Sequence, residues 1–159
     1  MLRLREGDNM LKLYYETDAM RVSYDKEQQL AVGTWKGFVT SKELRKTALD
    51  SLEFVNKHNI TRWLADRRNM KAIRQKDQQW TVEKFIPQIL ASPLRRMATI
   101  VSDDIFNKMA IDNIFERSNG LSTITLREFD NVEDALEWLK QPFEDEIVRN
   151  GPGSASAEA

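Results

Sequence analysis

Two short apolar segments separated by a helical pattern most constrain the fold of this chain. Residues 60–66 (ITRWLAD) and 97–101 (MATIV) are short and mostly apolar, which is typical of buried strands. The segment 77–92 between them spaces apolar residues such as Trp80 and Ile89 for one face of a helix. Strands joined by a helix cross over and pair in parallel, so the sequence predicts an α/β domain with a largely parallel sheet.

Alternating residues before the first helix predict an antiparallel start to the sheet. Residues 20–24 and 30–32 alternate apolar and polar side chains on either side of a short polar break. Two such runs with a short polar connection are typical of a β-hairpin. The earlier apolar run at 11–15 either adds a strand or leads into the hairpin.

Capping signals place the first and last helices. Thr40 and Glu43 match the capping box T-x-x-E, in which each residue binds the backbone of the other. Asp130 and Glu133 form a second such pattern before the last helix, which Pro142 is expected to end.

The two middle helices carry more specific expectations. Pro87 lies inside the second helical pattern, where it removes a hydrogen bond, so we expect a kink or two short helices. The helix expected at 104–118 is predicted to turn Phe106, Met109 and Ile114 toward the core.

Length and composition favour one domain with tails. The chain has 159 residues, enough for a core without metal or disulfide staples. We expect a flexible leader at 1–9, a domain at 10–141 and a tail at 142–159. From about residue 150 the tail is composed of Gly, Pro, Ser, Ala and Glu, which cannot bury apolar surface, so it is predicted to be disordered.

Composition also excludes several classes of protein. The chain has no cysteine, which excludes disulfides, thiol catalysis and thiolate metal sites. Its net charge of -1 creates no global field that would attract nucleic acid. No apolar run approaches the roughly 20 residues of a membrane span, and the start lacks the apolar core of a secretory signal. We therefore expect a cytoplasmic protein with no nucleic-acid partner and no membrane insertion.

Several local motifs carry a resemblance to a known family. They are the Y-D turn at 24–25, TWKG at 34–37, WLAD at 63–66, DQQW at 77–80 and SDDIF at 102–106. In this order, over roughly residues 10–140, they resemble the STAS / SpoIIAA-like domain family, and in particular small stand-alone bacterial STAS-like proteins. The resemblance implies a mixed α/β sheet with an N-terminal antiparallel hairpin, later strands mainly parallel, and about four helices packed on the sheet.

One position departs from the pattern of that family. In the anti-sigma factor antagonists, a phosphorylatable Ser follows the Asp that ends the corresponding strand. Here Asp66 is followed by Arg67, Arg68 and Asn69, so no hydroxyl is present to be phosphorylated. The resemblance therefore does not imply a kinase-controlled switch at this position.

Polar residues after the two buried strands are the first candidates for a binding site. Asp66, Arg67 and Arg68 follow one strand, and Ser102 and Asp103 follow the other. Ligand crevices of open α/β sheets lie beyond the carboxyl ends of the strands, and paired Arg side chains can bind a carboxylate or phosphate. The alternatives are a solvated surface loop for the first group and capping of the following helix for the second.

Trp80 is the remaining candidate. It follows a polar loop and precedes Pro87, which is a favourable place for a mobile lid over a pocket. The alternative is that Trp80 is an ordinary core residue whose indole N–H binds a neighbour.

The sequence does not predict an enzyme. It contains no P-loop and no G-x-G-x-x-G, and the single histidine, His58, has no partner pattern of a nucleophilic triad. We therefore expect no catalytic residues, no metal site and no cofactor. The favoured hypothesis is a regulatory module that binds a protein partner through a sheet edge or a helix face. The alternative is a carrier or sensor of a small apolar or anionic ligand near Trp80 and the loop from Asp66 to Arg68. Homo-oligomerisation through the first hairpin is compatible with both.

Overall fold

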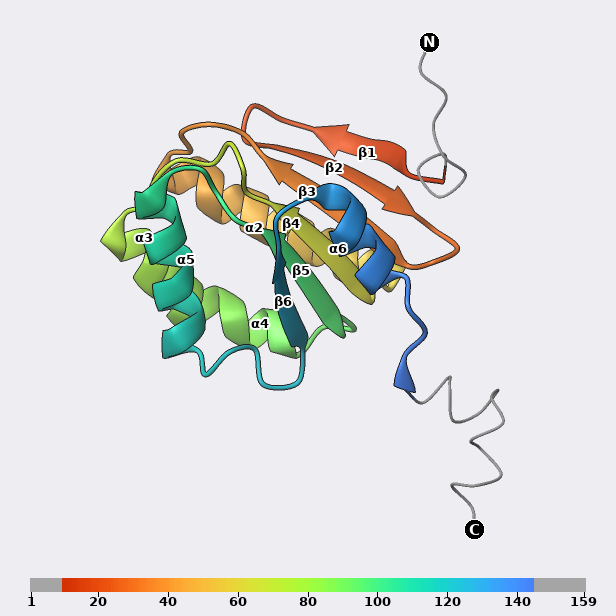
Figure 1. Cartoon of the computed structure of the whole chain (residues 1–159). Helices are drawn as coiled ribbons and strands as arrows, with labels where there is room; N and C mark the ends of the chain where they lie inside the picture. The colour runs from red at the N-terminus through yellow and green to blue at the C-terminus, as the bar shows by residue number, and fades with distance from the viewer. Residues whose placement is uncertain (1–9, 145–159) are drawn as a thin grey trace.

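The computed structural model describes residues 10–144, which form a six-stranded sheet covered by helices on both faces (Figure 1). The expected leader at 1–9 and the part of the expected tail at 145–159 lie outside the described residues. The strands are β1 (Lys12–Glu16), β2 (Met20–Asp25), β3 (Leu30–Trp35), β4 (Arg62–Asp66), β5 (Arg96–Ile100) and β6 (Thr125–Phe129). The helical segments are α2 (Ser41–His58), α3 (Gln75–Trp80), the π-helical turn η1 (Thr81–Phe85), α4 (Ile86–Leu90), α5 (Ile105–Arg117) and α6 (Val132–Leu139).

The strands lie side by side in the order in which they occur in the chain. β1, β2 and β3 pair antiparallel, whereas β3 to β6 pair in parallel through helical crossovers. The mixed α/β sheet predicted from the sequence is therefore confirmed, and the run at 11–15 does add a strand.

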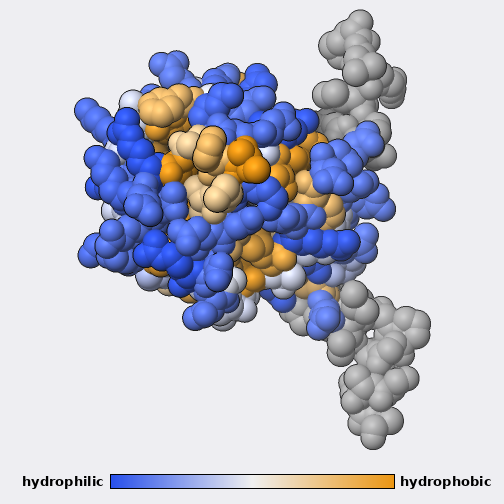
Figure 2. Space-filling view, turned by 60° about the vertical axis from the view of Figure 1, so that its left-hand side comes forward, coloured by the Kyte–Doolittle hydropathy of each residue, from blue (hydrophilic) through white to orange (hydrophobic). Residues whose placement is uncertain are grey.

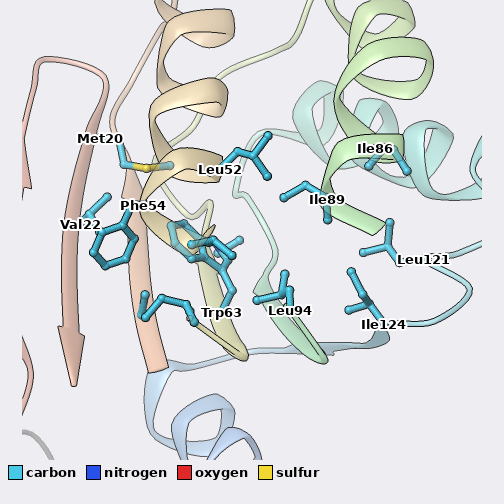
Figure 3. Packing of buried hydrophobic residues seen from close by; sticks show 14 residues of the cluster. Met20, Val22, Leu52, Phe54, Trp63, Ile86, Ile89, Leu94, Leu121 and Ile124 are labelled. Carbon is cyan, nitrogen blue, oxygen red and sulfur yellow. The ribbon is translucent and has the colours of Figure 1, made fainter. Parts of the chain in front are cut away.

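Two apolar cores flank the sheet because successive residues of each strand point to opposite faces. Trp63 and Ala65 of β4 belong to the core beneath α2 and α4, and Leu64 belongs to the core beneath α6. Figure 3 shows side chains from β2, α2, α4 and the segment before β6 converging in the first of these cores.

The expected capping box of α2 is present. The Thr40 side chain accepts a hydrogen bond from the Glu43 backbone at 3.1 Å, and the Glu43 carboxylate accepts one from the Thr40 backbone at 3.0 Å. Asn59 ends the helix in the left-handed conformation, with φ 51°. For α6 the expected cap was wrong by one residue: Asn131, rather than Asp130, accepts from the backbone N–H of Asp134 at 2.9 Å. The Asn side chain, placed one residue later, reaches the first turn.

The helical segment that contains Pro87 is divided as expected, because the π-helical turn η1 separates α3 from α4. The Thr81 hydroxyl donates to the Asp77 carbonyl at 2.7 Å where α3 passes into η1. The extra residue in this turn lets α4 restart with Pro87 in its first turn. A proline is tolerated there because the first N–H groups of a helix have no partner within the helix.

The orientation of α5 differs from the prediction. Phe106 and Met109 are 67% and 61% exposed, so their expected inward positions were wrong, whereas Ile114 is buried as expected. The buried face is formed by Asn107, Ala110, Ile111 and Ile114. Asn107 fixes this rotation because its side-chain amide donates to the Lys71 carbonyl at 2.7 Å beneath the helix.

Candidate functional site

The carboxyl ends of β4 and β5 bring most of the predicted site residues together. The backbone N–H of Arg67 donates to the Ile100 carbonyl at 3.2 Å, and that of Asp103 donates to the Arg68 carbonyl at 3.3 Å. Parallel strands end at the same edge of a sheet, which explains this proximity.

Asp66 and Arg68 satisfy each other at this edge. One carboxylate oxygen of Asp66 accepts hydrogen bonds from the backbone N–H and Nε of Arg68, at 3.2 and 3.0 Å. The other oxygen accepts from Arg68 Nη2 at 2.7 Å, and this side-chain bond raises the pKa of Arg68. Asp66 is buried, and its bonds to Arg68 stabilise the turn that follows β4.

Ser102 and Asp104 form hydrogen bonds that stabilise the neighbouring loop and the start of α5. The Ser102 hydroxyl donates to the Met70 carbonyl at 2.7 Å and accepts from the Asp104 backbone at 3.0 Å. Asp104 caps α5 by accepting from the Phe106 backbone at 2.9 Å, while Asp103 is exposed. In the part of the chain that the structure describes, no group of three or more His, Asp or Glu residues could hold a metal ion.

Arg67 points away from its two neighbours and into the protein. The extended backbone of β4 continues one residue beyond Asp66, so Arg67 lies on the same face as Trp63 and Ala65. Its Nη1 donates a hydrogen bond to the hydroxyl of Thr99 on β5. Burial lowers the pKa of the guanidinium to about 10, and the charge of Glu128 opposes this effect. At neutral pH the side chain is therefore a partly buried cation.

Two adjoining cavities lie between this face of the sheet and the helices. Their volumes are about 80 and 90 Å³. One extends toward β2 and Trp63, and the other extends toward α5 and Phe115. The residues that line both are Trp35, Ala48, Arg67, Phe85, Ile89 and Met97.

Trp80 does not line either cavity. It stacks on Phe85 with ring centroids 6.0 Å apart and an interplanar angle of 15°, and the Arg45 guanidinium lies 5.5 Å from its ring centroid. Trp80 therefore supports, from outside, a ring that forms part of the cavity wall. Its neighbours Thr81 and Phe85 line the cavity, whereas Trp80 itself does not.

Sequence reasoning missed most of the cavity wall. Phe85 and Met97 were not predicted to line a pocket, because a cavity-lining residue has the same apolar pattern as a packed one. The direction of Arg67 did have a signal, since the period of two through Trp63 and Ala65 predicts it on the buried face.

A larger and more open groove lies at the edge of the sheet. It measures about 240 Å³ and is lined by Tyr14, Tyr15, Phe54 and the charged side chains of Asp50, Glu53 and Lys57. Its charged rim and more open form distinguish it from the two mainly apolar cavities.

An apolar patch is exposed at the start of α5. We define the α5 patch as Phe38, Ile105, Phe106 and Met109, whose exposed fractions are 60%, 65%, 67% and 61%. The segment 70–71 joins its two parts, because the Lys71 backbone donates to the Gly37 carbonyl while its own carbonyl binds Asn107. Figure 2 brings this side of the molecule forward and shows apolar residues exposed among hydrophilic ones.

None of the helices within residues 10–144 combines the length and the apolar character that crossing a membrane requires.

The sequence matches no protein-family model and no curated protein. A solved structure with a similar fold is that of an uncharacterized protein from the DUF3478 family, with a SpoIIAA-like fold, from Shewanella loihica PV-4. The TM-score is 0.48 at 14% sequence identity, and the match covers 81% of this chain and 91% of that chain. The strand order and pairing of this chain themselves confirm the mixed α/β sheet expected from its sequence, with an antiparallel start and parallel later strands.

Proposed function

We propose that this chain binds a small, mainly apolar molecule between the sheet and its helices, and acts as a carrier or sensor without turning the molecule over. The observation that carries the proposal is the pair of adjoining cavities that share six lining residues. Small-molecule sites are hollows lined mainly by apolar side chains with few polar groups, and the two adjoining cavities have this character.

The size of the cavities limits the size of that occupant. An apolar cavity of about 150 Å³ is known to bind benzene or xenon, and these two cavities together have a similar volume. The ligand is therefore close to a benzene ring in bulk. The walls fit this class of ligand, since apart from Arg67 they offer only the hydroxyls of Ser51 and Thr81 as polar side chains outside the indoles.

A second candidate function is the binding of a protein partner, which the sequence favoured. The exposed α5 patch supports it, because four large apolar side chains at one end of a domain form the kind of surface that partners bury. The sheet edge is less suited to pairing. β1 is exposed, carries Lys12 and Glu16, and has a register shift between Leu13 and Tyr15, all of which hinder the addition of another strand.

The methionines of this chain can separate the two candidates in one experiment. Met20, Met70 and Met97 line the cavities, whereas Met109 belongs to the α5 patch. With carbon-13 in the methionine methyl groups, NMR spectra would be recorded while toluene is added as an apolar probe. Binding in the cavities shifts the three interior signals and leaves that of Met109 unchanged.

A cavity-filling variant provides the control. Ala48 lines both cavities, so Ala48→Leu should abolish the toluene shifts, whereas Ala72→Leu on the exposed loop should preserve them. Shifts confined to Met109, or toluene shifts that persist unchanged in Ala48→Leu, would overturn the proposal of interior binding.

A further inference from the structure

Arg67 places a charged group in the wall of two cavities that are otherwise apolar. Of the described residues that line them, it is the one with a charged side chain. Arg67 is partly buried, and removing a charge from water even in part is unfavourable unless the charge is paired, so its presence here needs a reason.

The hydrogen bonds of Arg67 leave most of its donors available. A guanidinium carries five N–H groups. One nitrogen donates to Thr99, and the guanidinium carbon lies 5.9 Å from the ring centroid of Phe115. Within residues 10–144 Arg67 makes no ion pair and no second side-chain hydrogen bond, in contrast to Arg68, which is paired with Asp66.

We propose that the ligand is a small apolar monocarboxylate, with its carboxylate on the free N–H groups of Arg67 and its apolar body in the cavities. This inference rests on the function proposed above and adds the chemical class of the ligand. The planar fork of a guanidinium matches the two oxygens of a carboxylate, and the bond strengthens away from water. Thr99 keeps the fork in place through the bond to the remaining nitrogen.

The surroundings of Arg67 favour a single negative charge. Arg67 also borders a small cleft of about 10 Å³ whose lining includes Asp112 and Glu128. The cation in that cleft, Lys108, is already paired with Asp112 at 2.7 Å. A phosphate dianion would therefore meet one available guanidinium and two nearby carboxylates, whereas a carboxylate needs only the guanidinium.

The test compares carboxylates with amides of nearly the same shape. Benzoate and benzamide, phenylacetate and phenylacetamide, and hexanoate and hexanamide would be titrated into the full chain up to millimolar concentration. The methyl signals of Met20, Met70 and Met97 report binding. We expect at least one carboxylate to bind at least tenfold more tightly than its amide.

Two variants assign that preference to Arg67. Arg67→Met should bring each carboxylate to the affinity of its amide while leaving toluene binding intact. Arg117→Met, at an exposed position of α5, should keep the tenfold preference. If Arg67→Met does not fold, the comparison of carboxylates with amides in the wild-type protein still shows whether the cavities prefer a carboxylate.

Each outcome has a distinct meaning. Amides that bind as tightly as carboxylates to the wild-type chain overturn the carboxylate inference and leave interior binding in place. A preference that survives in Arg67→Met also overturns it. If toluene and all six compounds leave the three interior methionines unchanged, both the inference and the proposed function are wrong.

Discussion

The indole of Trp63 on β4 lies against the backbone of Gly33 on β3, and it occupies the space that a side chain at position 33 would need. A Cβ added to Gly33 would come within 2.5 Å of Cζ2 of Trp63 and within 3.2 Å of the sulfur of Met20. We expect Gly33→Ala to lower the free energy of unfolding by about 1–3 kcal/mol, the usual effect of overpacking a core. Urea unfolding followed by circular dichroism measures this change.

A double variant isolates the Gly33–Trp63 contact. Trp63→Phe removes the ring atoms nearest to position 33, so adding Gly33→Ala to it should cost less than in the wild-type chain. Equal costs in the two backgrounds would show that the indole is not the obstacle.

Arg67 is expected to lower the stability of the ligand-free protein. Replacing a buried ionic group with an apolar residue of similar size is often neutral or stabilising by about 1–4 kcal/mol, so we expect Arg67→Met to unfold at a higher urea concentration than the wild-type chain. Because burial lowers the pKa of Arg67 to about 10, the folded state disfavours its charged form. Wild-type stability should therefore recover relative to the variant as the pH rises above about 10. A variant less stable than wild type at pH 7 would contradict this expectation.

The orientation of α5 can be tested by two substitutions one helical turn and a half apart. Ile111 is buried beneath the helix, so Ile111→Ala should lower the free energy of unfolding by about 2–4 kcal/mol. Phe106 faces solvent, so Phe106→Ala should change it by less than about 0.5 kcal/mol. Thermal unfolding of both variants against the wild-type chain distinguishes them. A large loss in Phe106→Ala would mean that this ring is covered.

Tyr15 should make the attachment of β1 sensitive to alkaline pH. Burial raises the pKa of its hydroxyl above the ordinary value of 10.0 for tyrosine, and a bond of 3.4 Å to the Ser51 hydroxyl opposes this rise. The folded state therefore favours the neutral phenol, and the resulting stability is present below about pH 10 and lost as the pH rises further. In Tyr15→Phe this part of the pH dependence should disappear. Urea unfolding at pH 8 and at several values above 10 compares the two chains, and parallel curves would refute the assignment.

The prediction from the sequence succeeded where one local pattern determines the structure. The apolar segments at 60–66 and 97–101 predicted parallel strands because a helix between two strands of one sheet usually forms a crossover connection. The Thr40–Glu43 capping box placed the start of α2 because its two bonds involve only neighbouring residues. Pro87 signalled a break because its effect on a helix is also local.

The prediction failed where a distant contact decides between two local solutions. In α5, Phe106 and Met109 are more apolar than Asn107, yet the bond from Asn107 to Lys71 turns the polar residue inward. At the last helix, Asp130 and Asn131 are both good caps, and only the geometry of the chain after β6 selects Asn131. The cavities themselves depend on how well α2, α4 and α5 fill the space above the sheet, which no local pattern specifies.

The order of the strands has a consequence for how this domain is assembled. Since each strand lies beside the one made just before it, no strand has to be inserted between two that are already paired. During synthesis the sheet can grow from one edge. The antiparallel strands β1 to β3 can pair first, and each later strand can then add beside the one before it. The first and last strands then stand at opposite edges, about 24 Å apart at the usual spacing between neighbouring strands. Because α6 and the residues after it return over β5 and β4, where the Gln141 carbonyl accepts a hydrogen bond from Arg62, a linker in a circularly permuted chain would span only the part of the sheet between β4 and β1.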